Sequence, residues 1–312
     1  MADHTVDAGG VKREAAPWSP TTAICEKPPI PIVVNTAQQC DVGDQHLLQA
    51  ANGLQKAFIL GQSGGMFPIR DHNPSRRPAL VTYALIALNV AVFLAMLPSY
   101  GDDRALLGLY SNWAMVPARI SLGDGYYTLF TSMFMHGGIL HIAGNMLFLW
   151  IFGDNLEDEM GHLRYLIFYL LCGVAAGMAQ YLAAPDARIP MVGASGAIAG
   201  VLGGYMLMFP KARVDVFFFF IVFFKVVPLP AWLMLGFWFG LQLLGELGSS
   251  GDGGVAYLAH IGGFIAGVLA TYPLWRRRGG RAFWDRTDGA PPHAAARYRI
   301  QTTSVPIVRR RK

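Results

Sequence analysis

The sequence predicts an all-α membrane protein in which six transmembrane helices form a bundle. Of its 312 residues, 53% are hydrophobic and only 14% are charged, whereas about a quarter of the residues of a soluble domain are charged. The apolar residues are also gathered into six segments, and a helix of roughly 20 apolar residues crosses a bilayer core. These two observations exclude an ordinary soluble domain and place the chain in a lipid bilayer.

The six predicted spans cover, in chain order, residues 79–97, 139–152, 165–184, 194–209, about 230–245, and 254–275. An uncharged run from Tyr126 extends the second span at its front. The fourth is short and has a glycine-rich start after Pro190. Its first turn should therefore lie inside the bilayer, where irregular backbone persists only if it is buried in protein or faces water. The apolar stretch 216–224 is too short to span before Lys225. We expect it at the interface or re-entering the membrane, with a separate span as the alternative.

Polar segments flank these spans and define three predicted regions. Residues 1–65 mix Pro, Gln, Asp and Gly without periodicity and predict a flexible leader. Residues 66–275 hold all six spans and form the membrane domain. Residues 276–312 predict a disordered, basic, cytoplasmic tail, for which a solvated state is favoured over attraction to anionic lipid.

Basic residues stand beside the first, fourth and sixth spans and predict the orientation of the chain. Because loops rich in Lys and Arg stay in the cytoplasm, an even number of spans places both termini there, in a plasma or inner membrane. The net charge of +5 is explained by this clustering, so nucleic acid is not an expected partner. The residues concerned are Arg70, Arg76, Arg77, Lys211, Arg213, Arg276, Arg277, Arg278 and Arg281.

Ser195 is the candidate nucleophile. It stands in Gly193-Ala194-Ser195-Gly196, at the start of the fourth span. A helix start offers free backbone N–H groups and partial positive charge to a developing oxyanion, provided that a base removes the hydroxyl proton. The alternative is a small-residue helix interface, since Gly196 and Gly200 form a GxxxG pair.

His260, in the sixth span, is the candidate general base. Gly263 and Gly267 form a second GxxxG pair on the same helix, so close packing of two glycine faces could bring the imidazole within hydrogen-bond reach of Ser195. A buried histidine bonded to a carbonyl is the alternative. No acidic residue lies in the fourth or sixth span, so we predict a two-residue dyad.

His141 and Asn145 are the candidate oxyanion-stabilising residues. They are four residues apart on the second span and therefore share a face. Together with the backbone N–H of Ser195 they could donate to a tetrahedral oxyanion. His136 is expected to tie the start of this helix to the outer loop, residues 98–128, which is predicted to face away from the cytoplasm. A metal held by His136, His141 and His260 is not expected, because no carboxylate or cysteine in these motifs completes a site. No cofactor is predicted.

These motifs, in this order on the second, fourth and sixth spans, resemble the rhomboid family of intramembrane serine proteases. The resemblance covers roughly residues 66–275. It implies a six-helix bundle with a water-filled cavity, a dyad of Ser195 and His260, and an oxyanion site formed by His141 and Asn145. It also implies substrates that are transmembrane proteins, cut in or near their membrane segments.

Two further features bear on the resemblance. The run from Phe152 to Asp158 resembles another family feature, in which Glu157 would be structural. Some members carry a Trp-Arg pair in the outer loop where this chain has Tyr127-Thr128, so the anchoring of that loop is an open question. A catalytically silent, client-binding relative is the main competing function, but retention of both Ser195 and His260 favours an enzyme. A transporter would be favoured by inverted repeats, which the sequence does not display.

Overall fold

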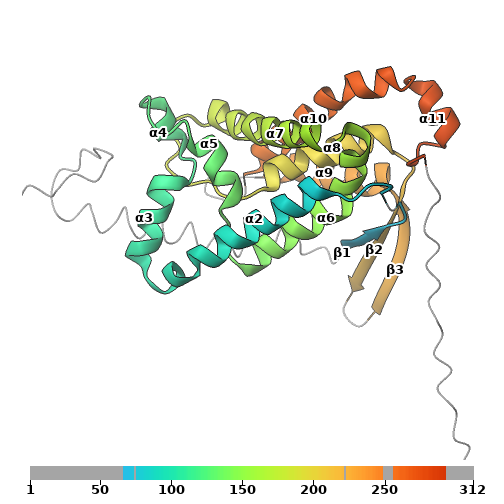
Figure 1. Cartoon of the computed structure of the whole chain (residues 1–312). Helices are drawn as coiled ribbons and strands as arrows, with labels where there is room; N and C mark the ends of the chain where they lie inside the picture. Colours follow the sequence, from blue (N-terminus) through green and yellow to red (C-terminus); the bar gives the residue numbers. More distant parts are fainter. Residues whose placement is uncertain (1–65, 74, 221–222, 249–255, 293–312) are drawn as a thin grey trace, which may run out of the picture. The chain divides into compact units, whose positions relative to one another are not determined.

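The computed structural model describes residues 66–73, 75–220, 223–248 and 256–292 (Figure 1). The predicted leader, residues 1–65, lies outside this part of the chain, as do residues 293–312. Six long helices dominate the part that is described: α2 (Leu80–Met96), α6 (Ile139–Met160), α7 (His162–Ala183), α8 (Ser195–Met208), α9 (Ala231–Leu247) and α10 (Tyr257–Arg277).

The six helices follow the predicted spans in order, but their lengths differ. Four of them, α2 with the short helix η1 (Leu97–Gly101), α6, α7 and α10, are long and apolar enough to cross a membrane. The other two, α8 and α9, are apolar but have only 14 and 17 residues. Four of the six predicted spans therefore have the length and composition of a membrane-crossing helix.

The second span differs most from its predicted boundaries. The uncharged run from Tyr126 does not lengthen α6 at its front. It forms the short helices α5 (Thr128–Thr131) and η2 (Ser132–Phe134). Helix α6 instead continues at its other end to Met160, because polar residues of its last turns have partners in the protein.

Glu157 is one of these polar residues and is structural, as expected. Its buried carboxylate accepts hydrogen bonds from the backbone N–H groups of Val81 and Thr82, both at 2.8 Å, and from the Thr82 hydroxyl at 2.7 Å. His162 Nδ1 lies 2.6 Å from Oε1, the same oxygen that accepts from Val81. Because the first N–H groups of a helix have no intrahelical acceptor, Glu157 satisfies the start of α2 and fixes it against α6.

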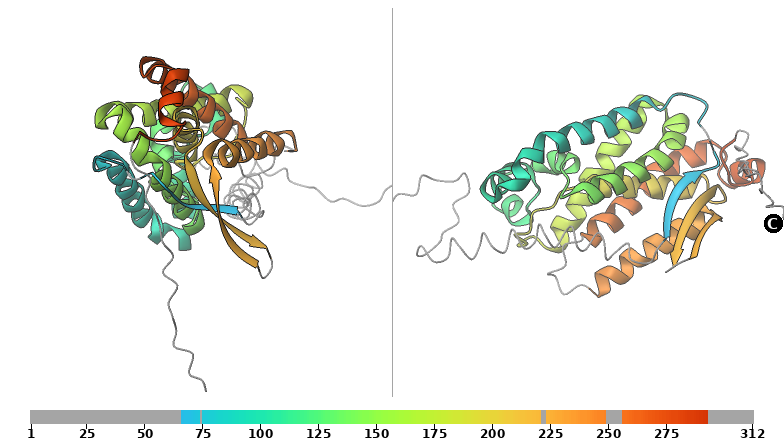
Figure 2. Two further views of the ribbon diagram at one scale, coloured as in Figure 1. Left: turned by 90° about the vertical axis from the view of Figure 1, so that its right-hand side faces the viewer. Right: turned by 90° about the horizontal axis from the view of Figure 1, so that it is seen from below.

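The all-α prediction is wrong at one end of the bundle, where three strands form an antiparallel sheet (Figures 1 and 2). In order across the sheet they are β1 (Met66–Asp71), β2 (Arg213–Phe220) and β3 (Phe223–Pro230). The stretch 216–224 lies in β2 and β3, apart from the undescribed residues 221–222, so it forms strands and not a helical span. Aromatic and β-branched residues favour strands, and the prolines of β3 are tolerated because β3 is an edge strand.

Polar contacts hold β1 and the residue that follows it against β2. Val214 and Val216 are fully buried, and Asp215 between them points to the other face, as alternation along a strand requires. Its two carboxylate oxygens lie 2.7 Å from Arg70 Nε and 2.7 Å from His72 Nε2. The sheet is thus held by a charged cluster on one face and the core on the other.

The beginning of the predicted disordered tail is also ordered. Helix α11 (Arg281–Thr287) packs against the end of α8, where Trp284 Nε1 donates to the Leu207 carbonyl at 3.1 Å. Phe283 is buried, and the ring centroids of Trp275 and Trp284 are 4.9 Å apart. These aromatic residues anchor the segment, although its overall composition is basic and polar.

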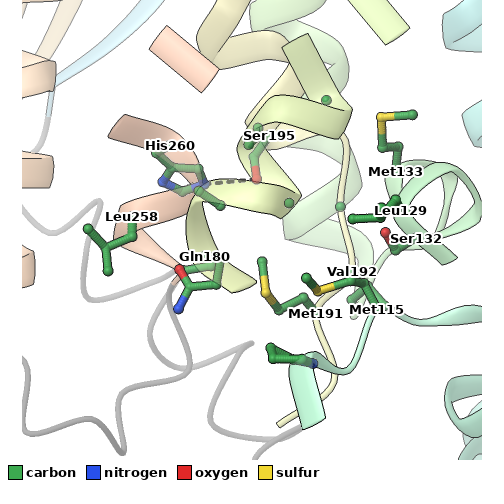
Figure 3. A pocket seen from close by; sticks show the side chains of 18 of the residues that line it. Met115, Leu129, Ser132, Met133, Gln180, Met191, Val192, Ser195, Leu258 and His260 are labelled. Atoms are coloured by element: carbon green, nitrogen blue, oxygen red, sulfur yellow. Dashed lines mark hydrogen bonds between the residues drawn. The ribbon is translucent and has the colours of Figure 1, made fainter. Parts of the chain in front are cut away.

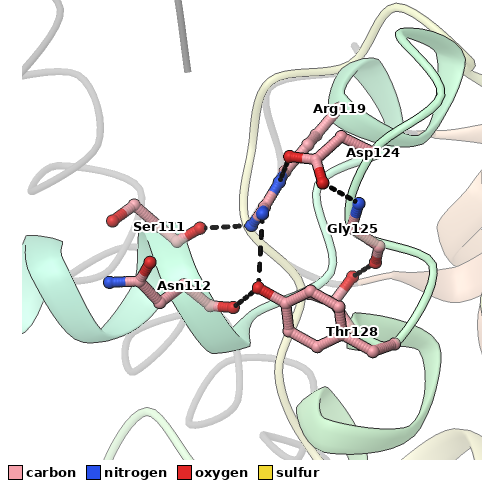
Figure 4. Close-up of polar contacts among 7 residues, drawn as sticks. Ser111, Asn112, Arg119, Asp124, Gly125 and Thr128 are labelled. Carbon is pink, nitrogen blue, oxygen red and sulfur yellow. Dashed lines mark hydrogen bonds and ion pairs between the residues drawn. The ribbon is translucent and has the colours of Figure 1, made fainter. Parts of the chain in front are cut away.

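At the opposite end of the bundle, α3 (Asp103–Trp113), α4 (Pro117–Ser121) and the start of α5 lie in the loop predicted to face outward, which we continue to call the outer loop (Figures 1 and 2). Arg119 anchors this loop (Figure 4). Its guanidinium donates to Asp124 at 2.7 Å, to the Ser111 carbonyl at 2.6 Å and to the Tyr127 hydroxyl at 3.2 Å. Arginine is therefore present in the loop, but it comes from position 119, where its guanidinium carbon lies over the Tyr127 ring, 5.6 Å from the centroid.

Candidate active site

Ser195 and His260 meet at the wall of a cavity (Figure 3). Ser195 is the first residue of α8, and its Oγ lies 2.8 Å from His260 Nε2 on α10. The two residues are 65 positions apart in the sequence. Both residues are half-buried and line the cavity, so they are reachable from it.

Two pairs of glycines bring α8 and α10 together. A Cβ built on Gly263 would fall 2.1 Å from the Gly196 carbonyl oxygen, and one on Gly267 would fall 1.9 Å from the Gly200 carbonyl oxygen. No side chain fits at such distances, so the backbones approach as closely as the two GxxxG pairs predicted. The small-residue interface and the Ser195–His260 contact are therefore two parts of one arrangement.

A third residue, Gln242 of α9, completes the hydrogen-bonded row. Its Oε1 lies 2.8 Å from His260 Nδ1, on the side of the imidazole opposite Ser195. Sequence reasoning looked for a carboxylate and missed this amide. The available signal was a polar residue in the middle of an apolar helix, where Gln242 stands among leucines and glycines.

His141 and Asn145 approach the same place from α6. A Cβ on Gly193 would lie 2.8 Å from His141 Nε2 and 3.6 Å from Asn145 Nδ2. Gly193 also has φ of +128°, a conformation that side chains disfavour. Glycine is required here on both counts, and it lets the chain pass directly over both side chains just before Ser195.

The Asn145 amide is a donor without an acceptor. Asn145 is buried, and its Nδ2 has no hydrogen-bond partner among the described residues. A buried unsatisfied donor is costly, so such a group calls for an explanation. At this position it could serve a negatively charged oxygen that arrives with a bound molecule.

His136 lies beside this pair and connects it to the outer loop, as expected. Its backbone carbonyl accepts a hydrogen bond from the Tyr100 hydroxyl of η1. Its side chain is fully buried, and its ring centroid is 5.1 Å from that of His141 with an interplanar angle of 70°. This edge-on contact limits the orientations that His141 can adopt.

The cavity has a volume of about 300 Å³ and reaches from the Ser195–His260 pair to the outer loop (Figure 3). Met115 and Met191 form part of its wall, joined by backbone hydrogen bonds of 3.1 and 2.8 Å between their segments. Gly193 N–H also donates to the Ser132 carbonyl at 2.9 Å. The segment that precedes Ser195 is thus held by backbone hydrogen bonds, so side chains are free to line the cavity.

Comparison with known proteins agrees with this geometry. The family model for the rhomboid domain matches residues 123–277, a region that includes Ser195, His260, His141 and Asn145. The chain belongs to the rhomboid family. Its family membership and its long apolar helices make it a membrane protein.

Several curated proteins are similar to this rhomboid domain. Rhomboid protein 1, mitochondrial, of Saccharomyces cerevisiae is 30% identical over 204 residues, which are 62% of this chain and 52% of that protein. The Rhomboid protease GluP of Bacillus subtilis is 30% identical over 197 residues, 62% of this chain and 34% of that protein. Rhomboid-like protein 11, chloroplastic, of Arabidopsis thaliana is 31% identical over 134 residues, 42% and 43% respectively. The chain therefore spans about half or less of the length of these relatives.

Proposed function

We propose that this rhomboid domain is an intramembrane serine endopeptidase that hydrolyses peptide bonds in or near the transmembrane segments of other membrane proteins. The observation that carries the proposal is the 2.8 Å contact between Ser195 Oγ and His260 Nε2 at the cavity wall. A serine hydroxyl becomes a nucleophile when an adjacent base accepts its proton. One of the similar proteins, from Bacillus subtilis, is named a protease.

In the proposed reaction Ser195 Oγ attacks the carbonyl carbon of the scissile bond while His260 Nε2 takes the hydroxyl proton. The tetrahedral intermediate then collapses, the C–N bond breaks, and His260 returns the proton to the leaving amine. Water, activated by the same imidazole, hydrolyses the acyl-enzyme and restores the serine. Every proton in this sequence moves through His260, which fits a two-residue dyad.

The oxyanion formed in each step would be held by three donors. These are the Asn145 amide, the His141 Nε2–H and the backbone N–H of Ser195 at the first position of α8. The Gly137 N–H lies 3.4 Å from His141 Nδ1, which favours the tautomer with its proton on Nε2. Donors that are already in place need no reorganisation as negative charge develops.

We also propose that all six long helices cross the membrane and that both termini are cytoplasmic. Arg76 N at the start of α2 donates to Asp158 at 3.2 Å, and Arg278 after α10 pairs with Glu159 at 2.7 Å. Both acidic residues lie at the end of α6, so the basic flanks gather at one end of the bundle. The positive-inside rule assigns that end to the cytoplasm, in a plasma or inner membrane. Reporter fusions at Arg76 and after Arg278 should therefore give the same side.

Incubation of the purified chain in proteoliposomes with a tagged single-span membrane protein tests the enzymatic proposal. Wild type should release a cleaved fragment, and Ser195→Ala should not. Ser132→Ala is the matched control, because it removes another hydroxyl at the cavity and keeps the carbonyl that binds Gly193. Cleavage by Ser195→Ala would contradict the proposal. Uncut substrate that co-purifies equally with both proteins would favour a catalytically silent, client-binding protein.

A further inference from the structure

We infer that Gln242 is a positioning residue for the general base, which extends the dyad to a row of three side chains on three helices. The inference rests on the proposed peptidase function. Three observations support it. Gln242 contacts His260, Gln242 contacts the backbone of its own helix, and α9 packs against α10.

The orientation of the Gln242 amide is fixed by its own helix. Gln242 Nε2 lies 3.4 Å from the carbonyl oxygen of Trp238, one turn earlier. The reverse orientation would put Oε1 against that carbonyl, where two acceptors would repel each other. With the amide nitrogen on Trp238, the amide oxygen faces His260 Nδ1 at 2.8 Å.

An oxygen facing Nδ1 selects the tautomer of His260. The oxygen can only accept, so Nδ1 must carry the proton and Nε2 must carry the lone pair. Nε2 is the atom that lies 2.8 Å from Ser195 Oγ. The resulting tautomer is the one that can remove the serine proton, and the same bond stabilises the imidazolium once Nε2 is protonated.

The packing of α9 on α10 sets this contact. Trp238 and Gln242 are four residues apart on α9 and share a face. His260 and Phe264 are four apart on α10, and both lie near Trp238, with ring centroids at 6.0 and 6.3 Å. A Cβ on Gly245 would fall 2.5 Å from the Tyr257 ring, so only glycine lets the start of α10 approach α9 this closely.

In this inference Gln242 orients His260 and does not itself transfer a proton. Gln242 is separated from Ser195 by the whole imidazole ring, and an amide does not titrate. His141 on α6 acts electrostatically on His260, and Glu246, one turn after Gln242 on α9, lines the same cavity. Both residues are unchanged in every variant below.

Steady-state cleavage of the tagged substrate by the full chain tests the inference. Gln242→Met keeps the length of the side chain and removes the acceptor. We expect kcat to fall about five- to tenfold, the worth of one hydrogen bond, with KM unchanged because Gln242 is not among the residues that line the cavity. Leu243→Ala, which changes an exposed neighbour on the same helix, should keep the wild-type kcat.

Gln242→Glu is the discriminating variant. A carboxylate accepts from Nδ1 as the amide does, so kcat at alkaline pH should exceed that of Gln242→Met. It also stabilises the imidazolium, which cannot act as a base, so the acid limb of the pH–rate profile should move to higher pH. A residue needed only for packing would change the melting temperature and leave this limb in place.

Two results would overturn the inference: wild-type kcat in Gln242→Met, or an acid limb that does not move in Gln242→Glu. Both would leave the peptidase proposal intact, because they require an active wild type. Lack of cleavage by wild type itself would instead contradict the proposed function. The two failures are therefore distinguishable in one set of measurements.

Discussion

Gly267 of α10 lies so close to Gly200 of α8 that a Cβ on Gly267 would fall 1.9 Å from the Gly200 carbonyl oxygen. The obstacle is backbone, which cannot move aside as a flexible side chain could. This contact holds together the two helices that carry Ser195 and His260. The distance between these two residues therefore depends on a position that touches neither of them.

Gly267→Ala should separate α8 from α10 and weaken both stability and activity. Overpacking of this kind costs about 1–3 kcal/mol, and a small displacement of His260 removes the contact to Ser195. Gly236→Ala on α9 is the matched control, since no atom of the described residues lies within 4 Å of its added Cβ. Thermal unfolding in detergent, read with the cleavage assay, checks both. An unaltered melting temperature in Gly267→Ala would show that α8 and α10 can separate without loss of stability.

The Asn145→Ala variant should retain a low but measurable peptidase activity. It removes one of several proposed oxyanion donors while Ser195 and His260 stay in place, so the rate should fall by about 10² to 10³. The loss should appear in kcat more than in KM, because the full charge exists only in the transition state. Comparison of kcat with that of Ser195→Ala, which should be inactive, gives the test. Wild-type kcat in Asn145→Ala would assign this residue to packing.

Arg119→Ala should loosen the outer loop. Arg119 is buried and donates to three acceptors from different parts of the loop, and each such hydrogen bond contributes about 0.5–1.5 kcal/mol. Limited proteolysis should therefore cut residues 98–128 faster in this variant. Asp124→Asn is the control, because Asp124 is exposed and only one contact changes. Equal cleavage rates in Arg119→Ala and wild type would mean that other contacts hold the loop.

Asp71→Asn should flatten the dependence of stability on pH. Burial, with the charge of Asp154 as a further cause, raises the pKa of Asp71 from 3.8 to about 7. Because the folded-state pKa is the higher one, the contribution of Asp71 to stability is complete below the unfolded value near 4 and is lost as pH rises through 7. The wild-type melting temperature should thus fall between pH 5 and 8 by more than that of Asp71→Asn. Equal falls would contradict the assignment.

The main helices and the proposed site residues could be predicted from sequence because their signals are local. Apolar length marks the helices, and Ser195 and His260 stand in short motifs with glycines at helical spacing. The GxxxG pairs also predicted which faces meet. For these features, the residues that form the sequence motif are the same residues that make the contact between the helices.

The sheet and Gln242 could not be predicted in this way, because both depend on distant partners. A short apolar run such as 216–224 suits a strand or a buried helix equally, and its partner strand β1 begins near the other end of the domain, with Arg70 and Asp215 separated by 145 positions. Gln242 belongs to no motif. Its contact with His260 depends on how α9 packs against α10, and tertiary packing determines that arrangement.

Labelling with a serine-directed fluorophosphonate, followed by mass spectrometry of the modified peptide, tests whether Ser195 and His260 act as a catalytic pair. A covalent adduct should form on Ser195 in the wild-type chain and form more slowly in Asn145→Ala. No adduct should form on Ser195 in His260→Ala, because the nucleophile needs its base. The many other serines of the chain serve as internal controls and should stay unmodified. An adduct formed at the same rate in His260→Ala, or no adduct on Ser195 in a folded wild-type protein that cleaves substrate, would contradict the claim that these two residues act as a catalytic pair.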